Sequence, residues 1–210
     1  MQNLVPCAMT KVVSTGSALD AGAALELYNL SQGKRALAIG PGLGTSEGTW
    51  RAISQLILSE TPKVIDADAL NLLARHGGKV GPNTVLTPHP GEMARLTGAS
   101  VEEILAAPVE YAQQLSQDMD CCVLLKGATT VIVRGEDVAM NITGCEAMGT
   151  GGCGDVLTGV IAGLMAQGMT PYDAARAGAY YHGCAGEAAA KQRGSRAVTA
   201  WDVCEALCIE

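Results

Sequence analysis

Short runs of apolar and β-branched residues alternate with helical patterns over most of the chain, and this alternation restricts the fold more than any other feature. The runs cover residues 36–39, 64–66, 84–86, 121–125 and 131–133. Among the helical patterns between them is a stretch over 101–118 that Pro108 is expected to interrupt. Such alternation predicts an α/β fold with a mainly parallel central sheet and helices on both faces. Residues 138–142 predict one more short, antiparallel strand.

Composition narrows the class of protein. The 210 residues suit one domain, and a net charge of −7 without a Lys/Arg cluster argues against a nucleic-acid or anionic-membrane partner. No apolar run approaches the roughly 20 residues that cross a bilayer, and the first ten residues lack the features of a secretory signal. Eight scattered cysteines without a CxxC pair predict free, buried thiols in a reducing cytoplasm rather than a zinc site.

A glycine-rich segment over residues 149–154 leads directly into the strongest helical pattern of the chain. Its four glycines let the backbone turn tightly and approach a ligand closely. Apolar residues then recur at helical spacing from Val156 to Met165, which predicts an amphipathic helix that starts near Asp155. Free N–H groups and the positive end of the helix dipole make such a start an anion site. An acidic protein can therefore hold a polyphosphate here without a basic patch.

Asp155 is the unusual member of this segment, because a carboxylate repels an anionic ligand. In one interpretation its side chain caps the helix, a role that involves no catalysis. In the other it is a general base, which takes a proton from a substrate hydroxyl as that hydroxyl attacks a phosphoryl group. The four preceding glycines favour the catalytic interpretation.

A glycine-rich segment follows the first predicted strand, and an acidic segment follows the second. GPGLG at 40–44 invites comparison with a dinucleotide fingerprint, because Asp66 closes the next strand at the spacing of a ribose-binding acid. The glycine spacing, and Pro41 with its missing N–H, instead favour a substrate loop at the strand end. Asp68 either caps the short helix that follows or belongs to the site, and both alternatives stay open.

Two later strand ends carry candidate ligand-binding side chains. His89 is held between two prolines at the sheet edge where open α/β sheets bind ligands. Glu92 follows in the first helical turn, within reach of a metal through water. Lys126 opens a turn over residues 126–130 that suits nucleotide phosphates, although the turn alone also fits an ordinary hairpin with a solvated lysine. His182 lies in an alanine-rich helix and is assigned to the core or to a partner contact.

Taken in chain order, five motifs form one combination: GPGLG at 40–44, VIDADALNLL at 64–73, TPHPGE at 87–92, LLKGATTVI at 124–132, and NITG at 141–144 followed by GTGGCGDVLTGVIAGLMAQG at 149–168. With this combination the chain resembles the ADP-dependent NAD(P)H-hydrate dehydratase family from about residue 36 to residue 203. Related kinases share the glycine-rich loop and the aspartate, but not TPHPGE together with this GPGLG. The resemblance implies a ribokinase-like fold.

The resemblance also implies a reaction and its residues. ADP is the phosphoryl donor, and the hydroxyl on the hydrated nicotinamide ring is activated and lost, which restores NAD(P)H and gives AMP and phosphate. Gly42 and His89 are implied to contact the hydrate, and Asp155 to contact its hydroxyl and act as the base. Magnesium is expected to bridge the phosphates, and the family suggests a homo-oligomer, specifically a tetramer. The residues implied to contact the adenine nucleotide are Lys126, Gly127, Ala128, Thr129, Thr130 and Gly154.

The sequence departs from the family at two places. Cys153 stands where the family usually has Thr or Ser, so a hydroxyl hydrogen bond to phosphate is expected to be weak or missing. Family members also carry a strand–helix–strand segment before the region that matches residues 3–13. We therefore expect a single domain over 1–210 that lacks this segment, exposes a sheet edge and tends to self-associate. The rival functions are a vitamin-precursor kinase of the same fold, such as a hydroxyethylthiazole kinase, and a nucleotide-binding remnant without turnover.

Overall fold

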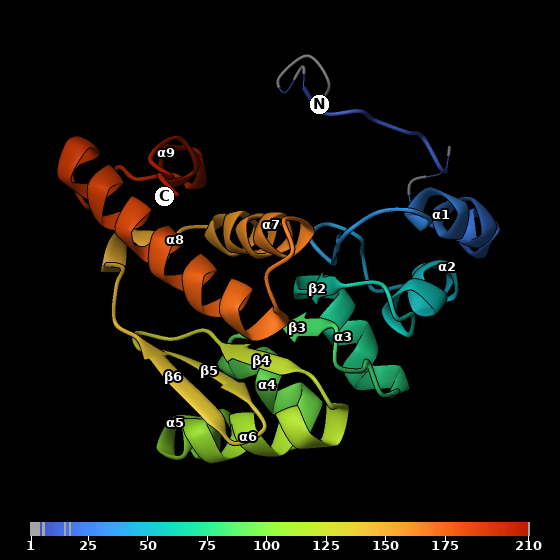
Figure 1. The fold of residues 1–210 in the computed structure, drawn as a ribbon, viewed down its shortest axis with the longest axis horizontal. Coiled ribbons are helices and arrows are strands. Elements are labelled where there is room, and N and C mark those ends of the chain that lie inside the picture. The colour runs from blue at the N-terminus through green and yellow to red at the C-terminus, as the bar shows by residue number, and fades with distance from the viewer. Residues whose placement is uncertain (1–4, 6, 15, 17, 210) are drawn as a thin grey trace.

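Six strands form one sheet in the described part of the chain, and they lie side by side in chain order (Figure 1). The computed structural model describes residues 5, 7–14, 16 and 18–209. The first four strands run parallel, and the last two are antiparallel, which confirms the mainly parallel sheet. The strands are β1 (Leu37–Ile39), β2 (Lys63–Ile65), β3 (Thr84–Leu86), β4 (Cys122–Leu125), β5 (Thr130–Arg134) and β6 (Asp137–Asn141).

Helices cover both faces of this sheet, as predicted (Figure 1). On one face α2 to α6 pack against the strands, and on the other α7 and α8 do so. The helical elements are η1 (Ala21–Ala23), α1 (Ala24–Ser31), α2 (Glu47–Ile57), α3 (Ala67–His76), α4 (Pro90–Thr97), α5 (Val101–Ala106), α6 (Pro108–Met119), η2 (Glu146–Met148), α7 (Cys153–Ala166), α8 (Pro171–Arg193) and α9 (Ala200–Glu205).

The strands point successive side chains to opposite faces, and both faces are apolar. Ile65 and Leu86 belong to the core under α2 to α6, whereas their neighbours Val64 and Val85 belong to the core under α7 and α8. All four of these side chains are completely buried. Burial on both faces is typical of parallel strands, and it leaves the strand ends as the place where polar side chains gather.

Most element boundaries agree with the sequence pattern. Pro108 opens α6 after α5 has ended at Ala106, so the expected interruption is confirmed. The antiparallel strand expected at 138–142 is β6, shifted by one residue. In contrast, α7 begins at Cys153, two residues earlier than predicted, because Gly152 ends the preceding loop without help from a side chain. No helix in the described residues is long and apolar enough to cross a membrane.

All eight cysteines are free thiols, but only some are buried as expected. Cys121, Cys122 and Cys153 are buried, and burial raises the pKa of the Cys122 thiol to about 12. The expectation of burial is wrong for Cys7, Cys204 and Cys208, which are exposed. The last two sit in and just after α9, which contributes only Val203 to the buried core.

Lys63 in β2 is a buried amine inside the sheet. It is 0% exposed, and its Nζ donates hydrogen bonds to the backbone carbonyls of Ser59 and Thr61. Loss of hydration on burial lowers the pKa of Lys63 to about 8, although the nearby Glu60 carboxylate acts in the opposite direction. Below this pKa the ammonium group is charged in the folded and the unfolded state, so the full cost of burying the charge is present.

We expect the protein to become more stable relative to Lys63→Met as the pH rises. The folded state releases the Lys63 proton near pH 8, whereas the unfolded state keeps it to about pH 10.5, the ordinary value. The unfolded state therefore binds more protons between these values, and stability rises with pH by roughly 2 kcal/mol from about pH 7 to about pH 10. Urea denaturation of both proteins over that range measures the difference. If the difference in unfolding free energy between the two proteins did not change with pH, the proposed cost of burying the Lys63 charge would be contradicted.

Candidate active site

The first turn of α7 is open at its start. Gly152 precedes the helix with φ +91°, a backbone conformation that glycine adopts without strain, and it offers no capping side chain. The Val156 N–H donates to the Gly152 carbonyl at 3.1 Å, so the amides of Gly154 and Asp155 lie ahead of the helical ladder. Asp155 makes no capping hydrogen bond, and the capping interpretation is therefore wrong: the helix has already begun two residues before it.

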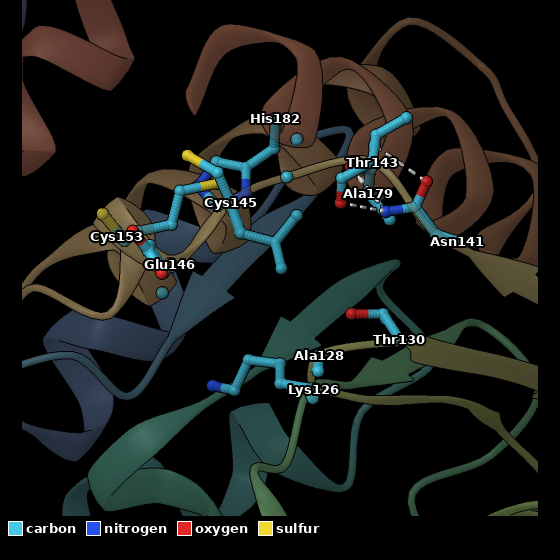
Figure 2. A pocket seen from close by; sticks show the side chains of 16 residues that line it. Lys126, Ala128, Thr130, Asn141, Thr143, Cys145, Glu146, Cys153, Ala179 and His182 are labelled. Carbon is cyan, nitrogen blue, oxygen red and sulfur yellow. Dashed lines mark hydrogen bonds between the residues drawn. The ribbon is translucent and has the colours of Figure 1, made fainter. Parts of the chain in front are cut away.

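A cavity of about 460 Å³ lies between this helix start and the turn that joins β4 to β5. Figure 2 shows Lys126, Ala128 and Thr130 on one side of it and Cys145, Cys153 and His182 on the opposite side. Of the six residues predicted to contact a nucleotide, Thr129 alone does not line the cavity. The lining residues are Lys126, Gly127, Ala128, Thr130, Asn141, Thr143, Gly144, Cys145, Glu146, Met148, Cys153, Gly154, Leu157, Ala179, His182 and Gly183.

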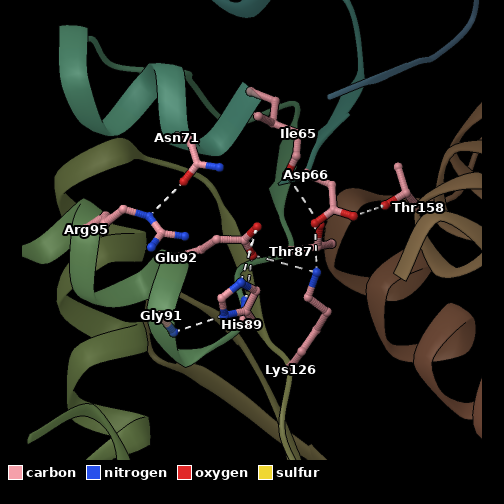
Figure 3. A network of polar contacts seen from close by, with 10 residues as sticks. All are labelled: Ile65, Asp66, Asn71, Thr87, His89, Gly91, Glu92, Arg95, Lys126 and Thr158. Atoms are coloured by element: carbon pink, nitrogen blue, oxygen red, sulfur yellow. Dashed lines mark hydrogen bonds and ion pairs between the residues drawn. The ribbon is translucent and has the colours of Figure 1, made fainter. Parts of the chain in front are cut away.

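Lys126 is held by a network of buried acidic side chains at the mouth of this cavity (Figure 3). Its Nζ lies 2.8 Å from Oδ1 of Asp66, which is 1% exposed, and 3.8 Å from Oε2 of Glu92. The buried Thr158 hydroxyl of α7 donates to the other Asp66 oxygen at 2.8 Å. The solvated lysine of an ordinary hairpin is thus excluded, because Lys126 connects the β4–β5 turn to the end of β2 and the start of α4.

His89 stands at the start of α4, at the carboxyl edge of the sheet. Its Nδ1 accepts the Gly91 N–H at 3.0 Å, while Glu92 Oε2 accepts the His89 backbone N–H at 2.9 Å. The two side chains therefore cap the helix reciprocally. His89 Nε2 lies 3.6 Å from Glu92 Oε1, and half of the His89 side chain is exposed. Glu92 links this exposed imidazole to the Lys126 ammonium group (Figure 3).

The glycine-rich loop after β1 is held by Asp68. The Gly44 N–H donates to Asp68 Oδ2 at 2.8 Å, across 24 residues of sequence. Asp68 therefore does not cap α3, which begins at Ala67 without any side-chain capping bond. Gly40 must be glycine, because a Cβ there would overlap the backbone carbonyl of Asp66. Gly42, with φ +70°, lies exposed in the same loop.

A second hollow, of about 640 Å³, lies on the other side of the α7 start, along the edge strand β1. Asp155 lines it together with the loop after β1, through Gly40, Pro41 and Leu43. No described residue pairs with the Asp155 carboxylate. Gly42 and His89 line neither hollow. The walls are otherwise mostly apolar: Leu19, Leu27, Leu30, Ser31, Lys34, Ala36, Leu37, Ala38, Ile39, Gly40, Pro41, Leu43, Ile53, Leu56, Thr158 and Gly159.

Three residues of this region have a larger role than their local sequence indicates. Asp66 stands at a strand end where α/β sheets bind ligands, but its pairing with Lys126 and Thr158 is not visible in the sequence, and His182 fits a core or partner contact equally well. The available signal for Asp66 is its position directly after a fully buried strand, where an unpaired carboxylate is costly and needs a partner. No group of three or more His, Cys, Asp or Glu side chains in the described residues is arranged to hold a metal ion.

Comparison with known proteins agrees with these motifs. The model of one protein family, described as NAD(P)H-hydrate dehydratase, matches residues 4–208. The chain belongs to the NAD(P)H-hydrate dehydratase family. The bifunctional NAD(P)H-hydrate repair enzyme Nnr of Moorella thermoacetica is 48% identical over 177 residues, which are 81% of this chain and 33% of that protein. The chain thus spans about a third of the length of this relative.

Solved structures confirm the ribokinase-like fold of this family member. The ADP/ATP-dependent NAD(P)H-hydrate dehydratase of Bacillus subtilis, co-crystallised with ATP/Mg²⁺ and soaked with CoA, has a TM-score of 0.74 at 35% identity. The match covers 82% of this chain and 64% of that one. A ribokinase-like superfamily protein of Enterococcus faecalis has a TM-score of 0.78 at 27% identity, over 89% and 66% of the two chains.

Proposed function

We propose that this chain catalyses the ADP-dependent dehydration of NAD(P)H hydrate, with AMP and phosphate as the other products. The observation that carries the proposal is the open start of α7, which stands between the cavity at Lys126 and the unpaired carboxylate of Asp155. One helix turn thereby offers amide donors for a phosphate and, at the next position, a base for the hydroxyl that attacks it.

In this proposal the nucleotide occupies the cavity. Its phosphates bind at the amides of Gly154 and Asp155, and the Lys126 ammonium group adds a positive charge beside them. The rest of the nucleotide extends along residues 127–130 towards α8. A cavity of about 460 Å³ is within the range of small-ligand sites. Cys153 is buried at this end and offers a thiol in place of the hydroxyl usual in the family.

The hydrate is placed on the Asp155 side, between the loop of Gly42 and the exposed imidazole of His89. Asp155 takes the proton of the hydrate hydroxyl while the hydroxyl oxygen attacks the terminal phosphoryl group of ADP, which releases AMP. The carbon–oxygen bond then breaks and phosphate leaves. Loss of a proton from the adjacent ring carbon restores the double bond of NAD(P)H, so that atoms and charges balance.

Magnesium fits the donor set only as an ion held mainly by phosphate and water oxygens. Asp66 is already paired with Lys126, and Glu92 is the remaining buried carboxylate at the cavity mouth. A magnesium ion that keeps several waters needs one or two carboxylates, so Glu92 would hold it through water. When bound, the ion would neutralise phosphate charge.

Three further expectations, on the domain, its location in the cell and its assembly, belong to the same proposal. Residues 1–210 are proposed to act as one domain in the cytoplasm, and its copies to assemble as a homo-oligomer, specifically a tetramer. Sedimentation of the purified chain at several concentrations measures the assembly. The test is independent of activity, because a monomer that still restores NAD(P)H would remove the tetramer and leave the reaction in place.

The decisive experiment is recovery of NAD(P)H absorbance from its hydrate with ADP and magnesium. We expect turnover with ADP, and none when the nucleotide is omitted. The rival vitamin-precursor kinase instead predicts that ATP is consumed with hydroxyethylthiazole and that hydrate is left unchanged. Binding of ADP in calorimetry without any turnover of hydrate would support the non-catalytic remnant and would reject the proposed reaction.

A further inference from the structure

His182 of α8 lines the cavity and carries a hydrogen-bonding atom that no described residue uses. The residue is 7% exposed, and its Nε2 is the one buried side-chain nitrogen or oxygen in the described chain without a hydrogen-bond partner. A buried polar atom left unpaired costs roughly 1–3 kcal/mol, so such atoms are rare unless a ligand or water completes them. Figure 2 shows His182 next to Cys145, on the wall of the cavity opposite Lys126 and Thr130.

The other ring nitrogen fixes the chemistry of Nε2. Burial lowers the pKa of His182, and the Lys126 charge acts in the same direction, so the imidazole is neutral near pH 7. The Cys153 backbone acts to raise this pKa, as a carbonyl does when it faces a ring N–H. Since Nε2 has no partner, Nδ1 carries the proton. Nε2 is therefore an acceptor and requires an O–H or N–H donor from a ligand.

The position of His182 decides which part of a nucleotide reaches it. Cys153 is the first residue of α7, so His182 lies beside the amides that face the phosphates. At the other end, Asn141 donates to the carbonyls of Thr143 and Ala179, and Thr143 donates to Asn141 and Tyr180. These polar groups already satisfy one another. The side chains that line the cavity beside them are small and apolar, which suits the flat base of the nucleotide. The sugar lies between the base and the phosphates.

We infer that His182 Nε2 accepts a hydrogen bond from a ribose hydroxyl of the nucleoside diphosphate. This inference rests on the proposed function, because it assumes that the nucleotide occupies the cavity. It assigns a specificity-determining role to a residue outside all five sequence motifs. The chain would thereby distinguish a ribonucleotide from its deoxy analogues with one buried acceptor.

Titration calorimetry of ADP, 2′-deoxy-ADP, 3′-deoxy-ADP and inosine diphosphate tests the inference. The full chain should bind ADP about 10-fold more tightly than at least one deoxy analogue, a typical value for one buried hydrogen bond. His182→Phe keeps the ring and removes the acceptor, so ADP and that analogue should bind equally. His182→Gln retains an acceptor and should keep part of the preference. His76→Phe is the control, because His76 stacks on Trp50 outside the cavity.

The outcomes separate this inference from the reaction. An unchanged ratio of ADP to deoxy-ADP affinity in His182→Phe would overturn it, whatever the variant does to overall stability. Discrimination against inosine diphosphate alone would also overturn it, because the base rather than the ribose would then face His182. If the unaltered chain restores NAD(P)H with ADP but does not discriminate, the ribose contact fails and the proposed function stands. If the chain binds no ADP, both fail.

Discussion

Asp155→Asn is expected to lower the turnover of NAD(P)H hydrate by about 100-fold or more, the usual contribution of a general base. Folding should be nearly unaffected, because the carboxylate is exposed, caps no helix and has no partner in the described residues. Removing a negative charge from the first turn of a helix costs only about 0.3–1 kcal/mol. ADP should bind equally well or more tightly, since a repulsive charge beside its phosphates is removed.

Asp173→Asn is the matched control for this substitution. Asp173 is also an exposed aspartate in the first turn of a long helix, α8, and lies away from the cavity and the hollow that Asp155 lines. Its carboxylate accepts from the Thr170 hydroxyl, a bond that asparagine can keep, and pairs with the exposed Arg176, which contributes little. It should show a comparable small change in melting temperature and no loss of turnover. Near-normal turnover of Asp155→Asn at saturating ADP would remove the base from the proposal. A large fall in melting temperature would show instead that the carboxylate supports the fold.

Lys126→Met should destabilise the protein by about 3 kcal/mol, because it leaves the Asp66 carboxylate buried without its cation. For a chain of this size the melting temperature would fall by roughly 6–12 °C. ADP binding should weaken as well, since the same ammonium group is proposed to face the phosphates. The two effects have different origins. Asp66→Asn combined with Lys126→Met removes the unpaired charge and should recover much of the stability, but not the ADP affinity.

Arg134→Met provides the matched control for the ion pair. Arg134 lies 2.8 Å from Asp120, the same separation as in the Lys126 pair, but the side chain of its partner Asp120 is 43% exposed, whereas that of Asp66 is 2% exposed. Exposed pairs contribute about 0–1 kcal/mol, so this substitution should have a small effect on thermal unfolding. If Lys126→Met and Arg134→Met lower the stability by equal amounts, then water reaches Asp66. Full recovery of ADP affinity in the double variant would place the phosphates away from Lys126.

The sequence was sufficient for the features that depend on local pattern. Short apolar, β-branched runs and helical spacing predicted the sheet and its helices, and the break at Pro108 follows from the ring of proline itself. The nucleotide contact of the turn at 126–130 was implied by the family resemblance, whereas the turn taken alone fits an ordinary hairpin. Only Thr129 of that turn does not line the cavity.

Contacts between distant segments were not predictable in this way. Asp66 and Lys126 are 60 residues apart, and Asp68 meets the amide of Gly44 across 24 residues, so neither partner is visible in a local window. The same applies to His182, whose spacing in an alanine-rich helix is typical of a core residue. Its unpaired nitrogen becomes evident only when α8 packs beside the start of α7. The start of α7 was misplaced because a glycine conformation, rather than a capping side chain, ends the loop.

The first turn of α7 is a wall shared by two compartments. Gly154 and Leu157 line the cavity, whereas Asp155 and Thr158 line the hollow along β1. The hydrogen bond from the Thr158 hydroxyl to Asp66 holds this part of the helix against the end of β2. A ligand that straightens or shifts the turn from one side therefore alters the other side too. Thermodynamic linkage requires the effect to be reciprocal: whatever factor one occupant applies to the affinity of the second, the second applies to the first. Slower hydrogen exchange at the amides of this single turn would report either occupant.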